Sequence, residues 1–139
     1  MAKFKTKFDS LVKLKKLKVD EIQNNISKLN ASLQQEEKIL HSLENELSSM
    51  ALPKEGNFAL ITQFKMIQQA KLKEIKQKQS QISFIKSQIE NLNNQLKEAN
   101  LEYEKMKYLQ GEEIKKYLKK LKENEAKQMD EIALLLYKG

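Results

Sequence analysis

An apolar residue recurs in alternating steps of four and three along the first fifty residues of the chain. The thirteen positions are Phe8, Val12, Lys15, Val19, Ile22, Ile26, Leu29, Leu33, Glu36, Leu40, Leu43, Leu47 and Met50. Eleven of them are apolar, and only Lys15 and Glu36 are not. Such spacing averages 3.5 residues, so the apolar side chains form a narrow seam that supercoils left-handedly against a partner helix. The seam predicts a coiled-coil helix over residues 3–50.

One cluster containing both proline and glycine, at residues 53–57, interrupts this pattern. The residue before a proline disfavours the helical conformation, so Leu52 should end the first helix, and Asn57 is suited to cap the next one. We therefore expect a turn over residues 51–57 and a second helix over residues 58–137. The fold class predicted for residues 1–139 is all-α: a single domain in which two long helices form an antiparallel coiled-coil hairpin, with the second helix longer and protruding.

The seam of the second helix is clearest in its middle. Its members there are Ile82, Ile85, Ile89, Leu92, Leu96, Ala99, Tyr103 and Met106. Upstream, the core positions are assigned to Leu72, Ile75, Gln68, Gln79 and either Lys65 or Lys71. Polar core residues lower stability but can fix register. A fold-back at residues 51–57 would place Met50 near Ile61 and Phe4 near residue 107.

Residues 111–137 extend past the end of the first helix, after a shift in the seam beside Gly111. They still carry an apolar face, formed by Ile114, Tyr117, Leu118, Leu121, Ile132, Leu135 and Leu136. An unpaired helix with such a face is marginally stable alone, so it is typical of a docking element for another protein. Pairing with a second copy of the chain is the alternative.

Catalytic and metal-binding patterns are missing from the sequence. The chain has no cysteine, and its one histidine, His41, has no neighbours that would complete a metal site or a triad. Adjacent carboxylates such as Glu36 and Glu37, or Glu112 and Glu113, diverge by about 100° on a helix and cannot act as a shared acid/base pair. We therefore expect no enzyme, no metal and no cofactor.

The formal net charge of +7 comes entirely from lysine, because the sequence contains no arginine. Tight recognition of phosphate and guanine favours the bidentate guanidinium, so the composition disfavours a nucleic-acid partner. No apolar run is long enough to span a membrane, and we expect a cytoplasmic protein. Lysines gather near both the start of the chain and residues 105–122, which suggests steering towards an acidic surface. A basic amphipathic helix at a membrane surface stays open as an alternative.

The first residues, Phe4-Lys5-Thr6-Lys7-Phe8 with leucines and a charged coiled coil following, resemble the start of the flagellar export protein FliJ family. The resemblance implies a non-enzymatic stalk of the flagellar type III export apparatus, similar in fold to the central stalk of rotary ATP synthases. Its open end would enter the hexameric ring of the export ATPase. The resemblance also implies contacts with the cytoplasmic domain of the export gate and with export chaperones, peripheral association with the inner face of the membrane through these partners, and a role in motility and chemotaxis.

The residues that we assign to the ATPase ring come from both ends of the chain; the resemblance implies the apolar ones, and we expect the lysines to steer the chain towards acidic loops of the ring. They are Phe4, Phe8, Leu11, Leu14, Lys15, Lys16, Lys18, Ile114, Lys115, Lys116, Leu118, Lys119 and Leu121. Those assigned to the export gate are Leu43, Leu47, Phe64 and Gln68. The competing hypothesis is a homo-oligomeric coiled-coil scaffold.

Overall fold

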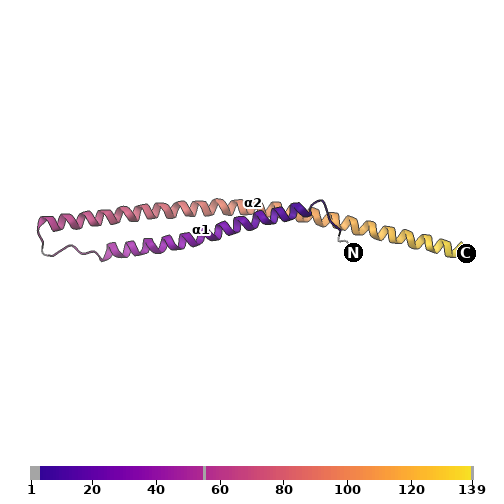
Figure 1. Cartoon of the computed structure of the whole chain (residues 1–139), viewed down its shortest axis with the longest axis horizontal. Helices are drawn as coiled ribbons and strands as arrows, with labels where there is room; N and C mark the ends of the chain where they lie inside the picture. Colours follow the sequence, from indigo (N-terminus) through magenta and orange to yellow (C-terminus); the bar gives the residue numbers. More distant parts are fainter. Residues whose placement is uncertain (1–3, 55, 139) are drawn as a thin grey trace. The chain divides into compact units, whose positions relative to one another are not determined.

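The computed structural model describes residues 4–54 and 56–138. Helix α1 runs over Asp9–Ser49 and helix α2 over Phe58–Lys138, with 41 and 81 residues (Figure 1). No strand occurs in the described ranges. Stretches of α1 pack against stretches of α2 through the seam, which confirms the predicted all-α hairpin with a longer second helix.

Contacts divide the chain into two compact units. We call Ile22–Gln95 the hairpin unit, because it holds the connection between the helices. Met1–Glu21 and Leu96–Gly139 form the other one, which we call the terminal unit. Each unit contains part of both helices. The assignment of residues 1–139 to a single domain stays a prediction.

The seam predicted for α1 is confirmed at every position. All thirteen residues of the 4-3 series are buried or half-buried, while most residues between them are exposed. Val19 and Ile22 are the most deeply buried, with 3% and 4% of their surface exposed. The two polar members, Lys15 and Glu36, are half-buried. The seam thus excludes water along α1, although few side chains are fully enclosed, as expected when only two helices meet.

The seam of α2 is confirmed over its middle and corrected upstream. All eight positions predicted between Ile82 and Met106 are buried or half-buried. The assignments of Leu72 and Gln79 are wrong, because both side chains are exposed, Leu72 by 42%, while Lys71 and Lys78 are half-buried in their places. Neighbouring helix residues point about 100° apart, so a seam that includes Ile75 and Lys78 by steps of three and four meets position 71, not 72.

Helix α1 starts later than expected. Residues 4–8 are not helical, and residue 3 lies outside the described ranges. Thr6 and Asp9 form a capping box. The Thr6 hydroxyl accepts from the Phe8 amide (3.1 Å), while the Thr6 amide donates to the Asp9 carboxylate (3.2 Å). These bonds satisfy free amides at the start of the helix and turn the preceding chain away from its axis.

The connection between the helices has the predicted N-cap. Oδ1 of Asn57 accepts a hydrogen bond from the Leu60 amide at 3.0 Å, at the first turn of α2. Gly56 lies close to Leu60: a Cβ at this position would come within 3.1 Å of its Cδ1 atom. Any larger residue would therefore press against Leu60 as the chain enters α2.

The expected register is wrong at the start of the chain. Phe4 contacts Tyr117, ten residues beyond the expected position 107. Two features account for the difference. In the hairpin unit, Glu46 already pairs with a residue 25 positions later, Lys71, so the offset begins near the connection. In the terminal unit, residues 4–8 are non-helical, and such chain advances up to about 3.3 Å per residue, against about 1.5 Å in a helix.

Candidate interaction surfaces

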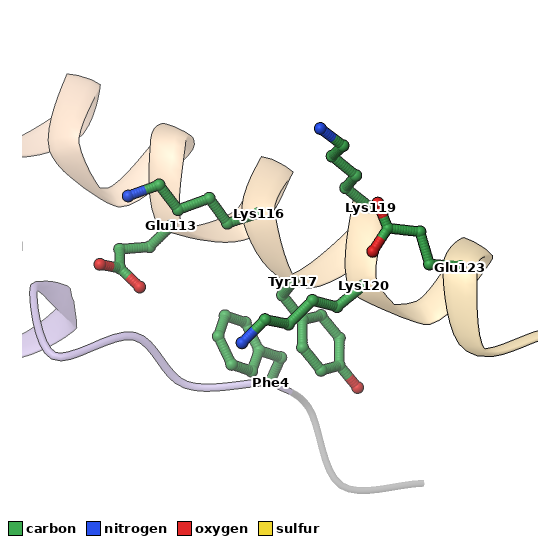
Figure 2. A pocket seen from close by; sticks show the side chains of 7 residues that line it. All are labelled: Phe4, Glu113, Lys116, Tyr117, Lys119, Lys120 and Glu123. Carbon is green, nitrogen blue, oxygen red and sulfur yellow. The ribbon is translucent and has the colours of Figure 1, made fainter.

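The non-helical start of the chain lies against α2 in the terminal unit. The ring of Phe4 stacks on the ring of Tyr117, with centroids 4.0 Å apart and an interplanar angle of 3° (Figure 2). Lys7 Nζ lies 3.7 Å from Oε1 of Glu113. We call residues 4–9 the clip, because they fasten the start of α1 to α2 up to Tyr117.

Asp9 is the polar centre of the clip. Its carboxylate accepts hydrogen bonds from the Thr6 hydroxyl (2.6 Å) and from the Gln110 side-chain amide (2.8 Å). These bonds, the one from Thr6 first and then the one from Gln110, hold the pKa of Asp9 below its ordinary value. Thr6 is buried beneath this arrangement. The apolar spacing did not predict the clip, although the spacing of Thr6 and Asp9 is a capping-box signal.

From Ile114 onwards, α2 has a largely exposed apolar face, on which Phe4 of the clip stacks at Tyr117. Leu118 exposes 52% of its surface, and every described side chain from residue 114 to 137 is classed as exposed. The exposed large apolar residues here are Ile114, Tyr117, Leu118, Leu121, Met129, Ile132, Leu134, Leu135, Leu136 and Tyr137. Lys115, Lys116 and Lys119, predicted for the ATPase ring, lie among them and are also exposed. The face and its lysines form a surface open to a partner.

The α1 segment of the terminal unit contributes a second row of exposed residues. Leu11 and Leu14, both predicted for the ring, are exposed, and so is Leu17, which the prediction omitted. Lys18 is exposed as well. The other residues of α1 predicted for the ring, and Phe8 just before it, contact neighbouring side chains. Phe8 is half-buried in the seam.

Two of the predicted lysines on α1 have partners inside the unit. Lys15 sits in the seam with its Nζ 3.9 Å from Glu102, and Lys16 Nζ lies 3.3 Å from Asp20. Lys16 also lies over the ring of Tyr103, 5.7 Å from its centroid. Lys16 is exposed and remains accessible to an acidic partner, whereas Lys15 is half-buried between the two helices. All thirteen residues predicted for the ring lie in the terminal unit, and their role stays a prediction.

A comparison with protein families gives the chain its place. The family model described as the flagellar FliJ protein matches residues 4–139. The chain belongs to the FliJ family. The chain is therefore a component related to flagellar protein export. The members of this family are non-catalytic export components, and the fold of this chain is a coiled-coil hairpin. No curated protein and no solved structure matches the chain.

Two further observations bear on the chemistry of this FliJ-family protein. Within residues 4–54 and 56–138, no helix combines the length and apolar character needed to cross a membrane. The same ranges contain no group of three or more histidine and carboxylate side chains arranged to hold a metal ion. His41 is exposed on α1.

The residues predicted for the export gate occupy a different environment in the FliJ hairpin. Leu43, Leu47, Phe64 and Gln68 are all half-buried positions of the seam in the hairpin unit. They therefore face the other helix with much of their surface, and their binding role stays a prediction. Exposed apolar side chains do occur near the connection, at Leu52, Phe58, Leu60, Met66 and Ile67. The apolar spacing could not reveal them, because they lie outside the seam.

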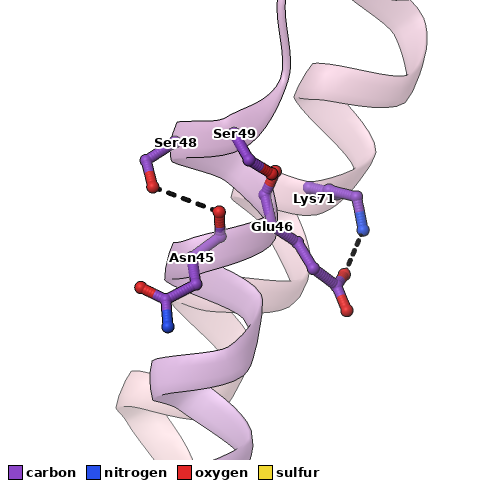
Figure 3. Close-up of polar contacts among 5 residues, drawn as sticks. All are labelled: Asn45, Glu46, Ser48, Ser49 and Lys71. Atoms are coloured by element: carbon purple, nitrogen blue, oxygen red, sulfur yellow. Dashed lines mark hydrogen bonds and ion pairs between the residues drawn. The ribbon is translucent and has the colours of Figure 1, made fainter.

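Charged residues cross the seam of the hairpin unit at two places. Lys71 Nζ donates to Glu46, beside the last turn of α1, where Ser48 donates to the Asn45 carbonyl oxygen (Figure 3). The hydrogen bond to Glu46 raises the pKa of Lys71. The other pair joins Lys78 Nζ and Glu36 at 2.6 Å, and both side chains are mostly covered. Each of these two seam lysines thus has a carboxylate partner on α1.

Proposed function

We propose that the chain is a stalk of the flagellar type III export apparatus that inserts its terminal unit into the ring of the export ATPase. Membership of the FliJ family supports a role in flagellar export. The observation that carries the finer proposal is that the terminal unit presents exposed apolar side chains on both helices, Leu11 and Leu14 on α1 and Ile114, Leu118 and Leu121 on α2. Exposed apolar side chains that gather in one unit mark a protein interaction site.

Charge supports the same assignment. The first twenty residues hold seven lysines, and Lys115, Lys116 and Lys119 are exposed among the apolar side chains of α2. A basic surface speeds the approach of an acidic partner and loses this advantage as salt rises. The proposed ring loops that receive the stalk are therefore acidic.

The stalk would act through differential contact. A bound protein can shift the states of a ring only if it binds one state better than another. The apolar and basic side chains of the terminal unit can make such contacts. Contact of the hairpin unit with the export gate, binding of export chaperones and peripheral membrane association through these partners belong to the same proposal and rest on family membership.

The test measures binding of the full chain to purified flagellar export ATPase, and stimulation of its ATP hydrolysis. Leu14→Glu and Leu118→Glu place a charge on each of the two exposed rows. We expect each variant to weaken binding about thirtyfold, as expected when a contact worth about 2 kcal/mol is lost. Phe84→Glu is the matched control, because Phe84 is as exposed as Leu14 but lies in the hairpin unit. Wild-type binding by both terminal-unit variants would rule the proposal out.

A further inference from the structure

The part of α2 that follows Tyr117 keeps the alternating spacing of three and four residues that defines the seam. Phe4, the first residue of the clip, stacks on Tyr117. From there, steps of three and four visit Leu118, Leu121, Glu125, Gln128, Ile132 and Leu135. All six are exposed, and Leu135 exposes 71% of its surface. On a continuous helix this spacing places them on one face.

We propose that this face pairs with the same face of a second copy of the chain, with the two helices antiparallel. In an antiparallel coiled coil, layers form between a first-position residue of one helix and a fourth-position residue of the other. One alignment satisfies all six positions. Leu118 lies opposite the second copy's Leu135, Leu121 opposite its Ile132, and Glu125 opposite its Gln128. Four apolar layers thus enclose two central layers in which a carboxylate meets an amide donor.

The symmetry of this alignment is closed. Each contact occurs twice, because residue i of one copy meets residue j of the other and the reverse. The polar residues at Glu125 and Gln128 meet only each other, so no apolar side chain faces a charge. A shift by one heptad would oppose Leu118 to Gln128 and Leu121 to Glu125, which leaves polar groups without partners.

Charge selects the antiparallel over the parallel arrangement. Residues 115–122 contain five lysines and no acidic residue. In a parallel pair these lysines would lie beside the same five, and Glu125 would face Glu125. In the antiparallel pair, residues 115–122 lie beside residues 131–138, which contain one glutamate and one lysine and carry no net charge. The two lysine clusters are then about 24 Å apart at about 1.5 Å per residue, well beyond the screening length of about 8 Å in physiological salt.

The pair is short and contains two polar layers, so it forms only at high protein concentration. It covers Leu118 and Leu121, which the proposed function assigns to the ATPase ring. The paired form is therefore a state in which the free protein shields its own exposed face. Self-pairing itself does not depend on the proposed function.

The test uses cysteine pairs in the full chain, which contains no native cysteine. Leu118→Cys with Leu135→Cys puts two thiols at opposing positions of the antiparallel pair. The two residues are about 25 Å apart along one helix, so they cannot bridge within a chain. In a glutathione redox buffer we expect a covalent dimer at a yield about tenfold above that of the controls, because pairing raises the effective thiol concentration.

Two controls separate the arrangements. Leu118→Cys alone cross-links only in a parallel pair. Leu118→Cys with Ala133→Cys has nearly the same spacing, but residue 133 lies on the opposite side of the helix from residue 135. Sedimentation of the cysteine-free wild type should show a mass that rises above 16.3 kDa with concentration. A constant monomer mass, or equal cross-linking in the control variants, would overturn the proposal.

Discussion

Single residues at the start of α1 decide where the helix begins. Thr6 and Asp9 satisfy each other and the first amides, and the chain before them leaves the helical path. The apolar spacing of Phe4 and Phe8 continues the pattern of the seam, so periodicity alone favours a helix from residue 3 and hides the capping box. Local hydrogen bonding therefore overrides the periodic signal at this end.

The pKa of Asp9 predicts a pH dependence of stability. Because the folded chain lowers this pKa, Asp9 stabilises the fold fully above its ordinary pKa of 3.8, and the contribution is lost as pH falls through the lower folded value. We expect the wild type to melt at a higher temperature than Asp9→Asn at pH 7. The difference should shrink as the pH falls below 3.8.

Circular dichroism melts of the two proteins from pH 7 to pH 2 measure this difference. Asp20→Asn is the control, because Asp20 is another aspartate of α1 but lies outside the clip. A gap between wild type and Asp9→Asn that persists unchanged at low pH would contradict the role of the Asp9 carboxylate.

At the scale of the helices, the buried seam holds α1 and α2 together. Ile82 exposes 6% of its surface, whereas Phe84, two residues later and larger, exposes 63%. We expect Ile82→Ala to lower the free energy of unfolding by about 2–4 kcal/mol, since it removes buried methyl groups and leaves a cavity. Phe84→Ala should change it by less than about 0.5 kcal/mol. Urea denaturation measures both values, and a larger loss for Phe84→Ala would refute the seam.

The heptad spacing was sufficient to predict which faces of the helices meet. It identified every seam position of α1, because apolar residues there outnumber polar ones by a wide margin. It failed at Leu72, where Lys71 and Lys78 occupy the seam and an isolated leucine beside them is a stronger apolar signal. Whether a lysine belongs to a seam depends on the carboxylate opposite, and Glu36 and Glu46 lie more than twenty residues away along the chain.

Pairs such as Glu36 and Lys78 also limit how the helices can slide. Moving α2 by one heptad would place Lys78 opposite an apolar seam residue and separate it from Glu36. Burying an unpaired charged group costs far more than an exposed pair contributes. The polar seam positions of the hairpin unit therefore specify register, whereas the apolar positions supply most of the stability.

At the scale of the whole chain, the number of residues in the two helices is unequal. The terminal unit contains the excess, because residues 118–138 of α2 follow Tyr117, on which Phe4 of the clip stacks. The sequence predicted the exposed apolar face of α2, because the position of the turn shows that the second helix is longer than the first. The clip and the offset between the helices depend on non-helical segments. The spacing of apolar residues predicts helix faces only, so it could not predict the conformation of these segments.

The excess predicts uneven local stability along α2. In dilute protein, we expect backbone amides of residues 118–137 to exchange with deuterium at least about tenfold faster than those of residues 96–106, which belong to the same unit and have a helical partner. Hydrogen exchange read by mass spectrometry of peptides from each segment measures the ratio. Equal protection of both segments would show that this part of α2 needs no partner.

The uncovered end of α2 also has a consequence for the heat of binding. A helix without neighbours loses order readily on warming. Any protein that covers this end must keep it helical, so part of the favourable enthalpy of association comes from backbone bonds inside α2 itself, offset by the entropy of ordering. Association at this end therefore weakens with rising temperature more steeply than the contact area alone would dictate.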